Sequence, residues 1–597
     1  MRLGIDVGGT FTDVVLAGAD GTIALAKAPT TPADQSDGVL AAIARAAATQ
    51  GLSPAALLGA TARIVHGTTA ATNALLEGKA ARVAMLTTEG HRDVIEMREG
   101  LKPERYNLRL VPPAPLVPRA LRLAVRERLR PDGTVAIPLD PGSLEAALET
   151  LAGAAVDAVA VCFLHAWRNP VHEAAAAAAV RARLPAVFVT ASAEVLPEIK
   201  EYERFSTTVA NAAVGPVIAT YLRRLETRLE AAGYRGRLFV ILSHGGVATV
   251  AEAVRLAAGT ALSGPAGGVA AAVALTRASG AARGGAIGGA IGGDLIAFDM
   301  GGTSTDIALL RDGVPGLAEG RTVGPARIAL PALDIVTLGA GGGSIAERDR
   351  SGLLAVGPAS AGAEPGPACY GLGGSAATVT DADLVLGYLD PARFLGGRRR
   401  LDVAAATAAI GRLAGELGLG VAAAAAGVQR LVDARMADGV RLATVRRGVD
   451  PRGFTLLAFG GAAGLHVSAV AGALGITRVV VPRAAAALSA WGMLHTELRI
   501  ELARSLDQGR GIDPAALLAA FAAMEAEGRA RLGAAGAAAE VRRAADMRYG
   551  EQVFELTVPL DGIDWDAAEL ADRLASAFLP PTRPATPMRC PGRRWWW

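Results

Sequence analysis

One eight-residue pattern occurs twice in this chain of 597 residues. Residues 6–13 read Asp-Val-Gly-Gly-Thr-Phe-Thr-Asp and residues 299–306 read Asp-Met-Gly-Gly-Thr-Ser-Thr-Asp, so six of the eight positions agree. Each copy lies between two short apolar runs, a pattern that predicts a strand, a tight turn and a second strand. Most of the shared positions are not core residues, so the agreement indicates an internal repeat. The chain is therefore expected to contain two copies of one structural unit.

Both turns carry residue types that can bind a phosphate together with its cation. Adjacent glycines let the backbone bend sharply or approach a ligand closely. Backbone N–H groups and hydroxyls suit phosphate oxygens, and the two bracketing carboxylates suit a divalent cation. A single Gly-Gly-Thr turn is more often only a hairpin, so the repetition is what favours a phosphate site. Two such loops facing each other across a cleft resemble those of the actin, sugar-kinase and Hsp70-like ATPases.

Composition excludes several classes of function. A chain of 597 residues is too long for one core and predicts about three to four domains. The 60 basic and 57 acidic residues give no electrostatic reason to expect nucleic acid binding, and the three cysteines have unrelated spacings that exclude a disulfide framework. Asp6 interrupts any signal-peptide core, and Arg412 and Glu416 break the alanine-rich stretch 405–427. We expect a soluble, cytoplasmic protein without a membrane span.

The hydrophobic pattern around the first repeat alternates between strands and helices. The predicted elements are three strands within 1–29, further strands at 62–65 and 83–87, and helices at 36–49, capped by Ser36 or Asp37, and at 70–77. This opening matches one ribonuclease-H-like half of the ATPase fold named above. Residues 100–145 are rich in proline and arginine, and we expect an excursion from the sheet towards a substrate or a partner.

Later stretches fit the second half of the same fold. A long helical pattern from 198 to about 230 is expected to break near Gly215-Pro216. The small residues of 263–270 open a helix that would cross between the lobes, and 484–493 would be the second crossing helix. The low-complexity stretch 284–293 is interpreted as a mobile loop.

Several further motifs allow two interpretations. His66-Gly67-Thr68-Thr69 follows a strand, where ligands bind in α/β sheets, but Thr68 or Thr69 could equally cap the next helix. The charged residues of 89–93 are interpreted as a solvated loop, and those of 198–205 as a solvated helix face. Cys369 would be a nucleophile only with a base that no sequence feature supplies. Gly460-Gly461, between an apolar run and a helix, matches an adenosine-binding element.

The C-terminal end differs in character from the rest. After about residue 577 the sequence becomes rich in proline and arginine and ends in three tryptophans, half of the six in the chain. Such an ending is typical of GC-rich DNA read out of frame. We therefore hypothesise a frameshift that truncates the last domain and leaves 580–597 as an aberrant tail, which resequencing the gene would test.

The ordered set of motifs resembles one family. The motifs are the two repeats, His66-Gly67-Thr68-Thr69, 263–268, 339–344, 362–371 and 460–466, and they look like the A subunit of the hydantoinase/oxoprolinase family. That family includes N-methylhydantoinase, the N-terminal half of 5-oxoprolinase, and the ATP-using subunits of acetone and acetophenone carboxylases. The resemblance runs from Met1 to about Leu560 and implies phosphorylation of a carbonyl or lactam oxygen by ATP.

The resemblance also implies a fold and roles for individual residues. The expected fold class is α/β: a duplicated ribonuclease-H-like ATPase fold, with lobes at 1–190 and 191–497, and an α+β domain at 498–579. ATP and Mg²⁺ are the implied cofactors, with Asp6 and Asp299 holding the metal and His66 assisting catalysis. The implied nucleotide-binding residues are Gly8, Gly9, Thr10, Thr12, Asp13, Gly301, Gly302, Thr303, Ser304, Thr305, Asp306, Gly460 and Gly461, with Thr68 and Thr69 at the substrate.

The motifs and the resemblance are compatible with three functions. The first is ring opening of a cyclic amide such as a hydantoin or 5-oxoproline, completed by a separate B-type subunit. The expectation of a partner rests on this chain, which has no recognisable hydrolytic triad, zinc-hydrolase helix or cysteine–histidine pair. The second reading is the ATP-using subunit of a ketone carboxylase, and the third is a non-catalytic, Hsp70-like ATP-binding activator. A sugar kinase is disfavoured because such kinases do not combine His66-Gly67-Thr68-Thr69 with 362–371.

Overall fold

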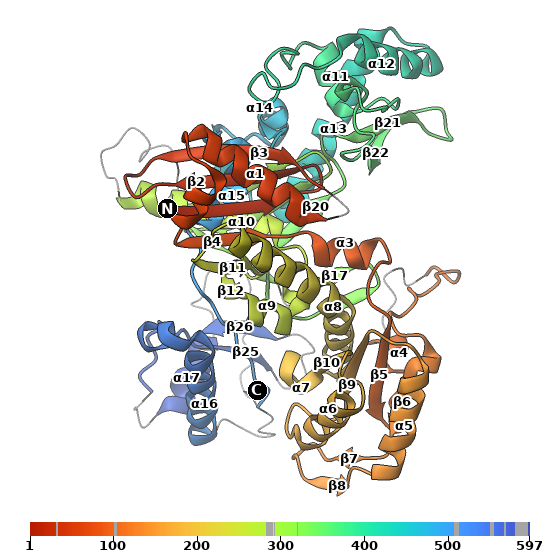
Figure 1. The fold of residues 1–597 in the computed structure, drawn as a ribbon, viewed down its shortest axis with the longest axis vertical. Coiled ribbons are helices and arrows are strands. Elements are labelled where there is room, and N and C mark those ends of the chain that lie inside the picture. Colours follow the sequence, from red (N-terminus) through yellow and green to blue (C-terminus); the bar gives the residue numbers. More distant parts are fainter. Residues whose placement is uncertain are drawn as a thin grey trace.

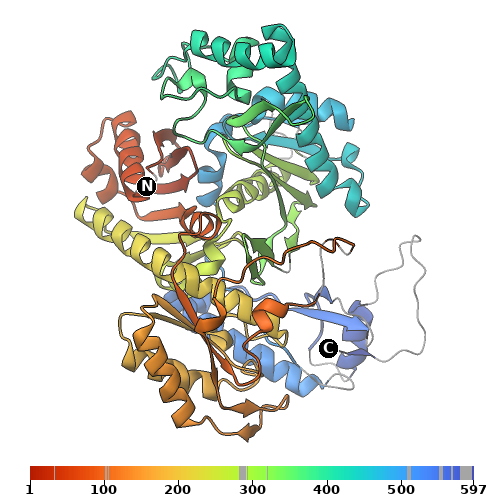
Figure 2. The same ribbon diagram turned by 90° about the vertical axis from the view of Figure 1, so that its right-hand side faces the viewer.

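Three large sheets and a separate C-terminal unit make up the chain (Figures 1 and 2). The computed structural model describes residues 1–31, 34–100, 104, 106–281, 291, 293–318, 320–506, 513–549, 555–565, 569–578 and 595–596. In both views the first and third sheets lie in the upper part of the molecule, and the second sheet and the C-terminal unit lie below them. The architecture is mixed α/β, as expected.

The first sheet contains the first repeat and has the order β12-β11-β4-β1-β2-β3. Its strands are β1 (Arg2–Val7), β2 (Phe11–Ala17), β3 (Ile23–Pro29), β4 (Arg63–Gly67), β11 (Arg237–Ile241) and β12 (Val247–Thr249). β1, β2 and β3 pair antiparallel, whereas β4 is parallel to both β1 and β11. Helix α1 (Gln35–Thr49) buries its apolar face on this sheet, and its cap is Asp34, not Ser36 or Asp37, because the Asp34 side chain accepts from Ser36 N.

The second sheet is entirely parallel and has the order β10-β9-β5-β6. It contains β5 (Val83–Thr88), β6 (Arg122–Val125), β9 (Ala158–Cys162) and β10 (Phe188–Ala191), with α5 (Pro141–Gly153) and α6 (Val171–Arg183). The stretch 100–145 is therefore not only an excursion, because it supplies β6 and the hairpin β7 (Arg128–Leu129) and β8 (Val135–Ile137). The lobe boundary expected at residue 190 does not coincide with a boundary between sheets. β5 and β9, which precede residue 190, belong to the second sheet together with β10, whereas β11 and β12, which follow it, belong to the first sheet.

Helix α8 (Glu201–Ala231) connects the first two sheets and passes through Pro216 without a break. The expected interruption is wrong because tertiary packing outweighs the proline, which costs about 3 kcal/mol in an isolated helix interior. Most residues from Arg204 to Ile218 are buried. A methyl group on Gly215 would overlap the ring of Phe188, so the glycine is what allows the helix to pack this closely on β10.

The third sheet contains the second repeat and has the order β15-β14-β13-β23-β24, with β20 also paired to β14. Its strands are β13 (Leu295–Met300), β14 (Thr305–Arg311), β15 (Val314–Pro315), β20 (Ile335–Leu338), β23 (Thr455–Phe459) and β24 (Arg478–Val480). Smaller pairs are β16 (Leu317–Ala318) with β19 (Ala332–Leu333), β17 (Arg321–Val323) with β18 (Ala326–Ile328), and β21 (Ser344–Arg348) with β22 (Leu354–Ser360). As in the first sheet, an antiparallel hairpin pairs with a parallel strand: β13 is antiparallel to β14 and parallel to β23.

Two helices rich in small residues lie between the first and third sheets. A methyl group on Gly267 of α10 (Gly264–Ala281) would lie 2.6 Å from Ser489 O of α15 (Leu488–Met493), and one on Gly492 would overlap Gly267 O. One hydrophobic cluster joins these helices to strands of both sheets, with Val65 from the first and Leu295 from the third. Both predicted crossing helices are therefore present. The stretch 284–293 lies outside the described residues apart from 291 and 293.

The third sheet is covered by α11 (Val379–Val385), α12 (Val403–Leu417), α13 (Val421–Ala443) and α14 (Ala463–Leu474), which share one core with it. The shorter helices elsewhere are α2 (Pro54–Gly59), α3 (Ala70–Leu76), α4 (Val94–Met97), α7 (Ser192–Val195) and α9 (Val250–Arg255). Among the described residues no single helix is both long and apolar enough to cross a bilayer. The helices 403–417 and 421–447 reach that length and hydropathy only as a pair bent by 90°.

The C-terminal unit has its own small core. It contains α16 (Pro514–Leu532), β25 (Ala544–Tyr549), β26 (Leu556–Pro559) and α17 (Leu570–Phe578), and its core includes Leu517, Phe521 and Leu574. Lys200 Nζ and Glu555 Oε2, 3.1 Å apart, link it to the start of α8. Of the proposed aberrant tail 580–597 only β27 (Trp595–Trp596) is described, paired with β25.

Candidate functional site

The two copies of the repeat form the same hairpin and face each other. In each copy the first aspartate lies opposite the last, Asp6 opposite Asp13 and Asp299 opposite Asp306. The turns are closed alike, by Gly8 N donating to Phe11 O and by Gly301 N donating to Ser304 O, both at 3.0 Å. A methyl group on Gly302 would lie 3.0 Å from Thr10 Oγ1, so the tips of the two turns meet.

The meeting point gathers four carboxylates and one lysine. Burial raises the pKa of Asp6 well above its ordinary value, and the charges of Asp13 and Asp299 raise it further. Burial and the Asp306 charge raise the pKa of Asp299 to about 7, and burial raises that of Asp306 to about 6. Among the described residues, Lys27 is the one cation that lowers these pKa values, with its Nζ 2.8 Å from Asp13 Oδ1. Four carboxylates against one ammonium group leave an excess of negative charge that a cation would neutralise.

This donor set fits Mg²⁺ bound jointly with a phosphate. Among the described residues no group of three or more His, Cys, Asp or Glu is arranged to hold a metal ion without other ligands. Mg²⁺ does not need such a cage, because it usually keeps several waters and takes one or two carboxylates together with phosphate oxygens. Asp6 and Asp299 end two central strands beside these turns, and each remains partly exposed.

The hydroxyl groups of the two turns divide into two kinds. Thr12 and Thr305, which occupy equivalent positions, are fully buried: Thr12 Oγ1 lies 3.2 Å from Thr30 Oγ1, and Thr305 Oγ1 donates to Ala340 O at 2.6 Å. Their side chains therefore hold the turns in place and do not face a ligand, contrary to the expectation that both would bind the nucleotide. The side chains at the tips, Thr10, Thr303 and Ser304, are partly or fully exposed.

Gly460 lies directly beside Asp299. Strand β23 pairs with β13 so that Phe459 is opposite Asp299, and the chain then turns at Gly460 with φ +88°. A methyl group on Gly460 would overlap Asp299 Oδ1 and lie 2.5 Å from Met300 O, whereas one on Gly461 would meet nothing within 4 Å. The close contact with Asp299 and Met300 therefore requires glycine at position 460, whereas the space beside Gly461 is open to a ligand.

The cluster 339–344 supports the second turn from behind. Gly342 N donates to Gly301 O at 3.1 Å and Gly343 N donates to Gly302 O at 2.6 Å. The sequence singled out these glycines without giving them a partner. Their contact with the second repeat shows that they shape the turn by backbone bonds, for which close approach without a Cβ is necessary.

His66 occupies a different position from the one expected of a catalytic residue. It is fully buried in β4, and its Nε2 lies 2.8 Å from the hydroxyl of Tyr221 on α8. Burial lowers the pKa of His66 to about 3, so the imidazole is neutral. The expectation that His66 acts on a substrate is not supported, because its side chain has no exposed surface and faces the core between β4 and α8.

Thr68 and Thr69 are held by the side chain of Gln35. Thr68 Oγ1 donates to Gln35 Oε1 at 2.9 Å, and Gln35 Nε2 donates to Thr69 Oγ1 at 3.0 Å. Thr68 also accepts from Ala70 N at 3.1 Å at the start of α3, which agrees with the capping alternative. The contacts leave the Thr69 side chain partly exposed.

Cys369 is unsuited to be a nucleophile. It is 1% exposed, and burial together with the nearby Asp381 raises the pKa of its thiol. Asp381 accepts from the backbone N–H groups of Ala368 and Cys369 and forms a capping box with Thr378 at the start of α11. The stretch 362–371 is therefore anchored to this helix.

The charged loop 89–93 lies at the surface, as predicted for a solvated loop, and there Asp93 pairs with Arg119.

Two residues of the site were missed in the sequence. Lys27 pairs with Asp13 across β2 and β3, and the register of this predicted hairpin contained the signal. Ser489, whose Oγ donates to Asp299 Oδ2 at 3.2 Å, comes from α15 and gave no local signal.

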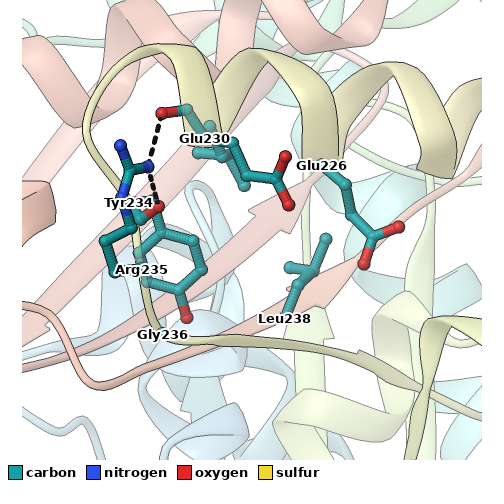
Figure 3. A pocket seen from close by; sticks show the side chains of 7 residues that line it. Glu226, Glu230, Tyr234, Arg235, Gly236 and Leu238 are labelled. Carbon is teal, nitrogen blue, oxygen red and sulfur yellow. Dashed lines mark hydrogen bonds between the residues drawn. The ribbon is translucent and has the colours of Figure 1, made fainter.

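A depression of about 500 Å³ at the C-terminal end of α8, lined by Glu226, Glu230 and Arg235 among others, holds none of the predicted site residues (Figure 3).

Known proteins are similar in sequence to most of this chain. Residues 204–502 match the hydantoinase/oxoprolinase family and residues 2–184 match the N-terminal region of that family. The chain is 39% identical over 580 residues to the caprolactamase subunit alpha of Pseudomonas jessenii, covering 96% of this chain and 82% of that protein.

Solved structures agree with the sequence matches. The crystal structure of the ATP-dependent caprolactamase from Pseudomonas jessenii superposes with a TM-score of 0.80 at 37% identity, over 100% of this chain and 86% of that one. Nucleotide-free acetone carboxylase gives a TM-score of 0.80 at 29% identity, over 97% and 83%. The chain therefore belongs to the hydantoinase/oxoprolinase family.

Proposed function

We propose that this chain is the ATP-using subunit of a cyclic-amide hydrolase of the hydantoinase/oxoprolinase type. The observation that carries the proposal is the meeting of two identical hairpins whose four aspartates outnumber their single lysine. ATP binds with Mg²⁺ at this point, and its γ-phosphoryl group is transferred to the carbonyl oxygen of the substrate. Phosphorylation withdraws electrons from the ring carbon, which makes that carbon open to attack by water.

The proposed roles follow the placement of each residue. Asp6 and Asp299 hold Mg²⁺, and the glycines and exposed hydroxyls at the two tips contact phosphate oxygens. Phosphoryl transfer needs positioning and neutralised charge more than covalent catalysis, and these residues supply both. The nucleotide-binding residues retained are Gly8, Gly9, Thr10, Asp13, Gly301, Gly302, Thr303, Ser304, Asp306, Gly460 and Gly461, while Thr12 and Thr305 support the turns and His66 packs against Tyr221.

The fold is proposed to be a duplicated ribonuclease-H-like ATPase. In support, the first and third sheets share one strand arrangement, β3-β2-β1-β4-β11 against β15-β14-β13-β23-β24. The repeated octapeptide occupies the first hairpin of both. Residues 83–191 then form an insertion between the fourth and fifth strands of the first half, because β4 and β11 are neighbours in the sheet.

Among substrates a lactam is favoured over a ketone. The caprolactamase subunit alpha is 39% identical over 96% of this chain, whereas the acetophenone carboxylase gamma subunit is 37% identical over 82% of it. Thr69 stays assigned to the substrate, since it is partly exposed at the carboxyl end of β4, whereas Thr68 is 1% exposed and positions Gln35. The ketone-carboxylase subunit is the second candidate, supported by the equal TM-score of 0.80.

A partner subunit is proposed to complete the reaction in the cytoplasm. The caprolactamase relative is named as a subunit, so it works within a larger assembly. The partner, a B-type subunit, would deliver water to the phosphorylated substrate.

A phosphate-release assay on the purified chain tests these proposals. We expect Mg²⁺-dependent ATP turnover that rises when caprolactam, hydantoin or 5-oxoproline is added, and ring-opened product only after the partner is supplied. Stimulation by acetone or acetophenone and not by any lactam would favour the carboxylase reading. Absence of ATP binding would refute the proposal, and stoichiometric ring-opened product from the chain alone would refute the need for a partner.

A further inference from the structure

A buried imidazole and two carboxylates lie behind the Gly460 turn. His466, on the first turns of α14, is 0% exposed, and its Nδ1 lies 2.8 Å from Asp433 Oδ1 of α13. On the other side of the ring, Nε2 lies 3.3 Å from Asp383 Oδ2 of α11. One side chain therefore ties three helices of the third sheet together. None of these residues belongs to the site described above.

The electrostatics favour a charged ring at this position. Burial alone would lower the pKa of His466, but the hydrogen bonds and charges of Asp383 and Asp433 outweigh burial and raise that pKa to about 9. These two carboxylates are the charged groups that face the ring. A buried carboxylate without a partner is strongly unfavourable, so the imidazolium is what allows both aspartates to remain in the core.

Both ends of this cluster reach the second repeat through backbone bonds. At one end, α14 begins directly after the Gly460 turn, where Ala462 N donates to Met300 O at 3.0 Å and Gly460 N donates to Ala485 O at 2.9 Å. At the other end, α11 carries Thr380, whose Oγ1 and N both donate to Gly342 O at 2.7 Å. Gly342 in turn bonds to Gly301 O. The second phosphate turn is therefore enclosed between α14 and α11, and His466 connects those two helices.

We propose that His466 is a positioning residue that fixes the Gly460–Ala462 turn against the 299–306 hairpin by bridging Asp383 and Asp433. It does not contact the reacting groups. It sets the distance between the element assigned to adenosine and the element assigned to phosphate, and therefore the affinity for the nucleotide. The part of the proposal that concerns nucleotide affinity rests on the proposed function, whereas the part that concerns the turn does not.

The chain offers a matched control. His172 is 7% exposed, and its Nδ1 lies 2.8 Å from Glu127 Oε2, the same separation as His466 has from Asp433. This second pair lies beside the parallel sheet β10-β9-β5-β6, where α6 packs on β9 and β10. The substitutions His466→Asn and His172→Asn therefore each remove a buried imidazole–carboxylate contact of 2.8 Å, one behind the Gly460 turn and one elsewhere, and His466→Asn also removes the contact with Asp383.

Amide hydrogen exchange on the intact chain tests the positioning role without any ligand. We expect exchange at Gly460 and Ala462 to become about tenfold faster in His466→Asn, and to be unchanged in His172→Asn. Asp383→Asn, which preserves the shape of the side chain, should give a smaller acceleration at the same amides. If exchange at the turn is unchanged in a folded His466→Asn protein, or is equally fast in both histidine variants, the proposal is wrong.

Titration with ATP and Mg²⁺ on the same proteins then separates the two proposals. We expect His466→Asn to raise the Kd for ATP about tenfold and His172→Asn to leave it unchanged. A wild-type chain that binds no ATP would refute the proposed function, while hydrogen exchange would still decide the role of His466. A loosened turn with unchanged ATP affinity would overturn the link to nucleotide binding. If His466→Asn fails to fold, Asp383→Asn decides by the same two measurements.

Discussion

The two copies of the repeat have nearly the same sequence and the same hairpin but different surroundings. In the first copy Lys27 Nζ lies 2.8 Å from Asp13, whereas in the second Asp306 receives only a hydroxyl, from Thr337 Oγ1 at 2.6 Å. The first turn is anchored by Thr30, whose Oγ1 donates to Gly8 O at 2.8 Å. The second is anchored by backbone bonds from the 341–343 cluster.

The hairpin is therefore the same in both copies, while the groups around it differ. Asp299 and Asp306 have no lysine of their own, and their pKa values are raised to about 7 and about 6. In the first copy the pKa of Asp6 is also raised well above its ordinary value despite Lys27. A cation approaching the site would therefore gain beside both copies, and we expect Asp6 and Asp299 to share it.

Removing the second-copy carboxylate should have the largest effect. Asp299→Asn should lower ATP turnover about 1,000-fold or more, because a lost metal contact in a phosphoryl-transfer site costs about 4 kcal/mol of transition-state stabilisation. Asp450→Asn, at an exposed aspartate paired with Arg452, serves as the control and should not change turnover. Turnover like that of the wild type in a folded Asp299→Asn protein would remove the second copy from the site.

The next largest effect is expected at the turn beside Asp299. Gly460→Ala places a methyl group against Asp299 Oδ1 at a residue with φ +88°, so we expect a loss of about 2 kcal/mol or more in the free energy of unfolding. ATP affinity should fall as well. For stability alone Gly461→Ala is the matched control, since a methyl group there meets nothing within 4 Å of the protein. Denaturant unfolding measures both, and equal stabilities would show that the crowding at Gly460 can be relieved.

The two halves should also respond to pH in opposite directions. His66 in the first half has a pKa of about 3 when folded, below its ordinary 6.5, so the unfolded chain binds a proton that the folded chain does not. Its contribution to stability is lost as pH falls from 6.5 towards 3. His466 in the second half has a folded pKa of about 9, so its contribution is full below pH 6.5 and is lost as pH rises through 9.

Calorimetry across pH can separate the loss of stability at acid pH, the acid limb, from the loss at alkaline pH, the alkaline limb. We expect Asp433→Asn, which removes one carboxylate from His466, to shift only the alkaline fall in melting temperature towards lower pH. The acid limb should move when His66 is substituted by Asn and not when Asp433 is; burial also lowers the pKa of His244 to about 3, so His244 contributes to the same acid limb. A shift of both limbs by one substitution would contradict the assignment of each limb to its histidine.

The sequence was sufficient for what depends on local pattern and insufficient for what depends on distant contacts. The hairpins followed from glycine positions and apolar periodicity, whereas the crossing helices and the Gly460 turn were implied by the resemblance to a known ATPase fold. The sequence could not show that α8 would continue through Pro216, because the packing of Phe188 on Gly215 comes from another sheet. Nor could it show that His66 is buried under Tyr221, since 155 residues separate the two.

The smallest effects should come from the partners that distinguish the two copies, and they test the comparison most directly. Lys27→Met removes the one ammonium group that, in the part of the chain that the structure describes, acts on the aspartates, whereas Thr337→Val removes one hydrogen bond to Asp306. The charge of Lys27 lowers the pKa of Asp6, Asp13 and Asp299, so its loss raises all three and adds repulsion towards the phosphates. We expect the Kd for ATP with Mg²⁺ to rise about tenfold in Lys27→Met and about twofold in Thr337→Val, because a charge acts on the whole cluster and a hydroxyl on one carboxylate.

Titration at two salt concentrations checks the cause: the Lys27→Met effect should shrink as salt screens the charge, and the Thr337→Val effect should not. Equal effects of the two substitutions would mean that the copies are electrostatically equivalent despite their different partners.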